Sequence, residues 1–97
     1  MRMMLKVTMD VDASNAAFDD GRLGKVLGET MERLKPESAY FTAVDGCRGG
    51  YIFFDMKDPS DIPSICEPFF HEFGAKIELM PVMTPEDVKK GIEKASR

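Results

Sequence analysis

The chain has 97 residues, enough for a single domain spanning residues 1–97 around one hydrophobic core. Its formal charge is −4 and its basic residues are scattered, which argues against a nucleic-acid or anionic-membrane partner. No stretch resembles a transmembrane span or a signal peptide, and Cys47 and Cys66 form no disulfide framework. We therefore expect a cytoplasmic globular protein with reduced thiols.

The first half of the chain predicts a strand, a helix and a second strand. Residues 4–11 alternate apolar and polar side chains, as a half-buried strand does. Ser14 or Asn15 is suited to cap a short helical turn. Apolar residues then recur with helical spacing over residues 23–35, which predicts an amphipathic helix. Residues 38–46 are rich in aromatic and small side chains and predict the second strand.

The second half predicts a strand, a helix and another strand. Residues 50–58 are apolar on both faces, which is typical of a central strand. Residues 58–74 predict a helix, and Pro68 lies deep enough inside it that we expect a kink or a break there. Residues 75–83 predict a fourth strand at a sheet edge, because Pro81 cannot donate a ladder hydrogen bond.

Residues 84–97 predict a terminal helix. Thr84 is a good N-cap, Pro85 suits the first helical position, and acidic residues follow in the first turn. The apolar stripe is thin and consists of Val88, Ile92 and Ala95. A stripe of this width predicts a helix that docks at an edge of the molecule.

The predicted order of elements is β-α-β-β-α-β followed by a helix. This is the order of the ferredoxin-like α+β fold, with an antiparallel sheet and two helices on one of its faces. The other face combines polar and apolar side chains, namely Lys6, Thr8 and Glu78 with Tyr51, Phe53, Met80 and Val82. A mixed face of this kind predicts a homodimer in which two sheets close on one another.

The glycine-rich stretch "DGCRGG" (residues 45–50) raises the question of phosphate binding. A P-loop requires a following Lys-Ser/Thr pair and a helix, whereas a strand follows here. A hairpin turn explains the stretch, because Asp45-Gly46 and Gly49-Gly50 tolerate positive φ. On this interpretation Arg48 is a solvated loop arginine, and the alternative is that it contacts an anionic ligand.

Four residues are candidates for contact with a ligand. His71 is the sole histidine and titrates near neutral pH, but no nucleophile can be assigned to it, so a structural surface histidine is the alternative. Lys6 and Asp55 interrupt apolar strands, either as a charge pair or as a polar cluster within a dimer. Tyr40 is either a core residue or a ligand contact. We predict no metal site, because one histidine and two distant cysteines match no ligand motif.

Three phrases carry a resemblance to known proteins: "LKPESAYFTAVDG" (34–46), "DMKDPSDIPSICEPFF" (55–70) and "ELMPVMTPEDV" (78–88). With them, the chain resembles the dimeric α/β-barrel proteins of ferredoxin-like fold, and more closely short bacterial members of uncharacterised activity. That superfamily includes muconolactone-isomerase-like enzymes, cofactor-free monooxygenases, stress-response proteins and ligand-sensing domains. The resemblance implies an architecture rather than one reaction.

The sequence therefore predicts a homodimer that binds a small apolar or amphipathic molecule, without a cofactor and without evident catalytic machinery. The pocket is expected between sheet and helices or within the barrel, lined by Met and Phe. The alternative is a cofactor-free isomerase or monooxygenase in which His71, Tyr40 or Asp55 handles protons.

Overall fold

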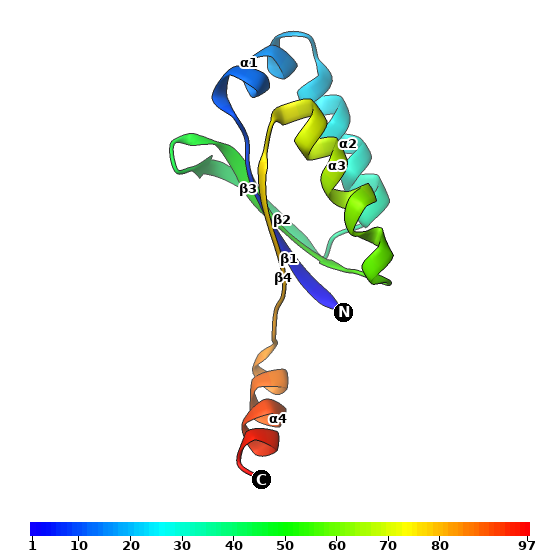
Figure 1. Cartoon of the computed structure of the whole chain (residues 1–97), viewed down its shortest axis with the longest axis vertical. Helices are drawn as coiled ribbons and strands as arrows, with labels where there is room; N and C mark the ends of the chain where they lie inside the picture. The colour runs from blue at the N-terminus through cyan, green and yellow to red at the C-terminus, as the bar shows by residue number, and fades with distance from the viewer.

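The structure, a computed structural model, describes all 97 residues. Its sheet has the order β2-β3-β1-β4 with every neighbouring pair antiparallel. The strands are β1 (Arg2–Thr8), β2 (Ser38–Val44), β3 (Cys47–Asp55) and β4 (Lys76–Pro81). The helices are α1 (Val11–Asp19), α2 (Arg22–Leu34), α3 (Ile62–Phe73) and α4 (Pro85–Ala95), with a 3₁₀ turn at Pro59–Asp61. Helices α2 and α3 lie on one face of the sheet, which confirms the ferredoxin-like α+β fold (Figure 1).

The core lies between that sheet face and the helices. Strand β1 alternates as predicted, and the side chains that it turns toward the helices are buried. The fully buried large side chains of the core are Leu5, Ile52, Phe54, Phe69 and Phe73. Each contributes about 1.5–3 kcal/mol to folding through the apolar surface that it removes from water.

Helix α1 begins earlier than the sequence predicts. Asp10, in extended conformation, caps it by accepting a hydrogen bond from the backbone N–H of Ala13. Ser14 is therefore buried inside the helix rather than capping it, and the predicted turn capped by Ser14 or Asn15 is wrong. The alternation of residues 4–11 hid this start, because Val11 continues the strand pattern although β1 ends at Thr8.

Helix α3 continues through Pro68, so the alternative of a break there is wrong. Proline removes one helical hydrogen bond and crowds the preceding turn, at a cost of about 3 kcal/mol. Buried side chains on both sides of it outweigh this cost, among them Ile65 and the neighbouring rings of Phe69 and Phe73. The helix ends as predicted at Gly74, whose φ is 52°.

The stretch at residues 45–50 is a hairpin turn, as predicted. Asp45 and Gly46 have φ values of 51° and 78° and form a two-residue connection between β2 and β3. Gly49 and Gly50 do not have positive φ; they belong to strand β3. A Cβ added at Gly50 would lie 2.6 Å from the carbonyl oxygen of Tyr40. The second glycine pair is therefore required by close approach of backbones rather than by turn geometry.

Helix α4 starts as predicted but does not dock. Thr84 and Asp87 cap it reciprocally, each side chain accepting from the other residue's backbone N–H. The helix extends away from the sheet and makes no extensive contact with another helix or strand (Figure 1). The molecule is consequently elongated, measuring 55 Å along its longest axis and 26 Å along the next. Docking at an edge of its own chain is thus a wrong prediction.

None of the helices combines the length and the apolar character that crossing a bilayer requires.

A glycine comparison tests the close approach within the hairpin. We expect Gly50→Ala to lower the free energy of unfolding by about 1–3 kcal/mol, because the methyl group meets backbone that cannot yield. Gly24→Ala is the control, since its Cβ meets nothing within 4 Å and alanine favours a helix by about 1 kcal/mol. Urea denaturation measures both. Equal stability of the two variants would contradict the close-approach explanation.

Candidate functional site

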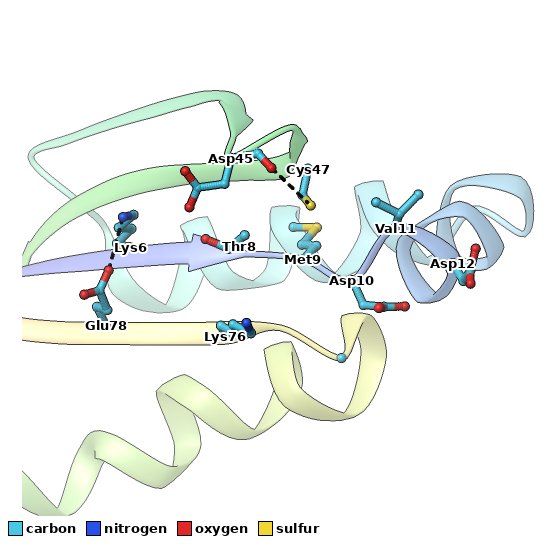
Figure 2. A pocket seen from close by; sticks show the side chains of 11 residues that line it. Lys6, Thr8, Met9, Asp10, Val11, Asp12, Asp45, Cys47, Lys76 and Glu78 are labelled. Atoms are coloured by element: carbon cyan, nitrogen blue, oxygen red, sulfur yellow. Dashed lines mark hydrogen bonds and ion pairs between the residues drawn. The ribbon is translucent and has the colours of Figure 1, made fainter.

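Two hollows flank the β2–β3 hairpin, one on each side of the sheet. The first, which we call the polar pocket, has a volume of about 520 Å³ and lies at the end of β1 on the open sheet face (Figure 2). Its polar side chains include Lys6, Thr8, Asp45, Lys76 and Glu78. They come from strands β1 and β4 and from the hairpin, so residues far apart in the sequence converge there.

An ion pair between β1 and β4 forms the floor of the polar pocket. Lys6 and Glu78 lie opposite each other in the strand register, with Nζ and Oε2 3.2 Å apart. Glu78 raises the pKa of Lys6 above its ordinary value by hydrogen bonding to the ammonium group and by charge attraction. The Lys6 side chain is only 28% exposed. The pocket therefore holds a lysine that stays protonated at neutral pH.

The same register extends across the whole open face. Tyr40, Tyr51, Lys6 and Glu78 form one row, from the β2 edge to the β4 edge. The adjacent row is mostly apolar and consists of Ser38, Phe53, Met4 and Met80. The face is thus mixed as predicted, and its polar and apolar residues are arranged in separate rows.

The second hollow, the hairpin groove, lies on the helix side of the sheet between α2 and the hairpin. Its volume is about 610 Å³. Apolar side chains form most of its wall, among them Met9, Val11, Leu23, Leu27 and Phe41. Phe41 remains 51% exposed, although its ring packs where Gly50 carries no side chain. The groove is therefore an apolar surface that this chain alone leaves partly open to water.

Arg48 anchors helix α1 to the hairpin. It is half-buried, and its Nη1 donates to Ser14 Oγ and to Asn15 Oδ1, both at 2.8 Å. The guanidinium carbon also lies 5.4 Å from the centre of the Phe18 ring, within cation–π range. The predicted solvated loop arginine is wrong. Parity explains the difference, because even-numbered residues of β3 face the helices.

Two of the four predicted site residues, Lys6 and Tyr40, lie in one row of the open face with Tyr51 between them. Tyr40 is 65% exposed, so its interpretation as a core residue is wrong. Asp55 lies at the opposite end of that face from the polar pocket, where Lys57 and the terminal amine of Met1 pair with it. Lys6 and Asp55 therefore do not form a charge pair with each other.

His71 lies on the outer surface of α3. Its side chain is 77% exposed, and its Nε2 lies 3.1 Å from Oε2 of Glu67, one turn earlier in the helix. This is the geometry of the structural alternative, a surface histidine beside a carboxylate. Neither hollow has His71 in its wall.

The two thiols differ in environment. Cys66 is buried in the core, and burial raises the pKa of its thiol. Cys47 is half-exposed and borders both the polar pocket and the hairpin groove. No group of three or more histidine, cysteine, aspartate or glutamate side chains is close enough together to hold a metal ion.

Sequence reasoning missed the groove residues. The sequence pattern places Phe41 in a strand and Leu23 and Leu27 in a buried helix stripe, and neither pattern indicates a groove. Alternation in β2 does place Phe41 and Tyr40 on opposite faces, so that signal was present. That α2 leaves Phe41 partly uncovered depends on tertiary packing and has no sequence signal.

A family model described as a domain of unknown function (DUF3303) matches residues 1–96. The chain therefore belongs to that family. No curated protein matches the chain.

The stability of the protein at acid pH tests the ion pairs that Asp55 forms with Lys57 and with the terminal amine of Met1. Hydrogen bonds from Lys57 and from the terminal amine lower the pKa of Asp55 from 3.8 to about 2. Because the folded pKa is below the unfolded one, this carboxylate stabilises the fold above about pH 4 and loses that effect as the pH falls toward 2.

We expect Lys57→Met to raise the pKa of Asp55 toward 3.8, measured by NMR titration. Asp87 is the internal control, since the Thr84 backbone and side chain lower its pKa independently of Lys57. An Asp55 that titrates at its ordinary value in the unmodified chain would contradict this description.

Proposed function

We propose that this protein is a homodimer of the dimeric α/β-barrel type that binds a small apolar or amphipathic molecule in each hairpin groove. The observation that carries the proposal is the groove itself, a mainly apolar hollow of about 610 Å³ bordered by one arginine. Small-molecule sites are typically apolar hollows of about 300–1,000 Å³ with a few polar groups. The cytoplasm suits such a protein, since Cys47 and Cys66 are both free thiols.

The groove also supports an amphipathic ligand over a purely apolar one. Arg48 borders it, and the two hydrogen bonds that it donates both use Nη1. A guanidinium group carries five N–H donors, so others remain to receive an acidic or carbonyl oxygen. An aliphatic or aromatic body would then lie against Leu23, Leu27 and Phe41.

The open sheet face supports the homodimer. Helices cover the other face, whereas the row with Phe53, Met4 and Met80 has no covering element in this chain. Two such faces related by a twofold axis would place apolar row near apolar row and remove both from water. The Lys6–Glu78 pairs would then lie inside the dimer, where their mutual attraction strengthens.

The alternative, a cofactor-free isomerase or monooxygenase, finds support in the polar pocket rather than in His71 or Asp55. There a protonated lysine lies beside a carboxylate that is able to accept a proton. Such a pair suits removal of a proton next to a carbonyl group, with the ammonium stabilising the enolate. If the protein turns over a carbonyl compound and the Glu78→Gln variant does not, that result would favour the enzyme over a binding protein.

A charge placed on the open face tests the dimer. We expect Phe53→Glu to convert the dimer to a monomer of 10.9 kDa, because a buried unpaired carboxylate is costly. Phe70→Glu is the matched control, since Phe70 is an exposed phenylalanine on α3, away from that face. Sedimentation velocity at micromolar concentration measures both. An unchanged chain that sediments as a monomer would contradict the proposed dimer.

Two neighbouring aromatics test the location of the ligand site. Phe41 and Tyr40 are both exposed on β2 but lie on opposite faces of the sheet. With anilinonaphthalene sulfonate as a fluorescent probe, we expect Phe41→Ala to weaken binding about tenfold, because it removes an aromatic wall of the groove. Tyr40→Ala should leave probe affinity unchanged. The reverse pattern would move the site to the open face and contradict the proposal.

A further inference from the structure

Strand β2 leaves alternate backbone groups without a partner along one edge of the sheet. In β3, the carbonyl of Arg48 accepts a hydrogen bond from Met9, which follows β1. The carbonyl of Phe53 accepts instead from Glu37, which precedes β2. Hydrogen bonding alternates along an antiparallel strand, so odd-numbered residues of β3 bond to β2, and their register partners there are even-numbered. The β2 residues that direct N–H and C=O away from the sheet are therefore Ala39, Phe41 and Ala43.

Nothing in the sequence of β2 protects this edge against an added strand. Its seven residues include no charge and no proline, and its pairing with β3 runs without a bulge from Ser38 to Val44. The opposite edge, β4, carries Lys76, Glu78 and Pro81. Charges, prolines and bulges are the features by which proteins keep edge strands from pairing further. Because β2 also makes no extensive contact with any element except β3, it is the edge of this sheet that is open to a further strand.

The hairpin groove and this edge share residues. Phe41 and Ala43 belong to the wall of the groove, so that wall contains unpaired backbone donors and acceptors as well as apolar side chains. A strand added beside β2 would lie about 4.8 Å from it and would turn every second side chain toward the helix side of the sheet. That is the side on which the groove lies, between α2 and the hairpin. One extended segment would therefore reach both the backbone of β2 and the groove.

We propose that the ligand of the hairpin groove is an extended peptide segment that adds a fifth strand beside β2 and places apolar side chains in the groove. This inference rests on the proposed function and names the class of its ligand. A compact apolar molecule would fill the groove but leave the outward N–H and C=O groups of β2 to water, whereas a peptide satisfies both. Backbone hydrogen bonds then supply affinity, and the groove selects among side chains. Arg48 is the sole charged residue of the groove wall, which favours a segment that carries a carboxylate.

Amide hydrogen exchange tests the strand pairing directly. In the free protein we expect fast exchange at Phe41 and Ala43, whose N–H groups face water, and slow exchange at Tyr40 and Thr42, which bond to β3. The probe is the hexapeptide Ser-Ile-Thr-Ile-Ser-Leu with a free terminal carboxylate, since its apolar residues alternate as a strand requires. At saturation it should slow exchange at Phe41 and Ala43 about tenfold or more. Unchanged exchange at both amides would overturn the proposal.

Two N-methylated isomers of the probe provide the matched control. One is methylated at its isoleucines and the other at its threonine and second serine, so their side chains are identical and only the blocked edge of the peptide differs. Alternate residues of a strand point their N–H groups to opposite edges, so we expect one isomer to bind about tenfold more weakly than the unmodified peptide and the other to bind equally well. Fluorescence anisotropy of fluorescein-labelled peptides measures this difference. Equal affinity of the two isomers would overturn the proposal.

The same titrations separate this inference from the proposed function. If anilinonaphthalene sulfonate binds in the groove and the hexapeptide does not bind, the peptide inference fails while the proposed function stands. The same conclusion follows if both methylated isomers bind as tightly as the unmodified peptide. If neither the sulfonate nor the peptide binds, the proposed function itself fails.

Discussion

The four-stranded sheet carries apolar side chains on both faces, but helices cover only one of them. On the covered face Leu5, Ile52 and Phe54 pack against α3 and complete a core. On the open face Phe53, Met4 and Met80 form a row beside the Lys6–Glu78 pair. Because an apolar row of this kind gains stability when it is removed from water, the open face is the surface at which we propose that two copies meet. The proposed dimer rests on that apolar row.

A ligand that binds the proposed dimer more tightly than the monomer would stabilise the dimer by mass action. The family to which the chain belongs carries no assigned activity, so the groove and the polar pocket are the features that any assignment must explain.

Local patterns in the sequence were sufficient for most of the fold. The alternation of β1, the helical spacing of α2 and the capping residues of α4 each report a structure within one element. Errors arose where two signals competed, as at Asp10, where a strand pattern masks a helix cap. They also arose at Pro68, where core packing by Phe69 and Phe73 overrides a local helix breaker.

The site was less accessible to prediction, because it depends on which residues lie opposite one another across strands. Lys6 and Glu78 are separated by most of the chain, and only the β1–β4 register brings them together. Asp55 interrupts an apolar strand and His71 is the sole histidine, but Asp55 pairs with Lys57 and with the terminal amine of Met1, and His71 lies beside Glu67. The direction that α4 takes was equally invisible, since a helix stripe does not tell which surface covers it.

Native mass spectrometry of the protein, purified gently from its own host, tests the central claim most directly, because it reports assembly and retained ligand together. The account predicts a species of twice 10.9 kDa that carries a small additional mass for each chain. A species of 10.9 kDa alone, with nothing bound, would contradict it.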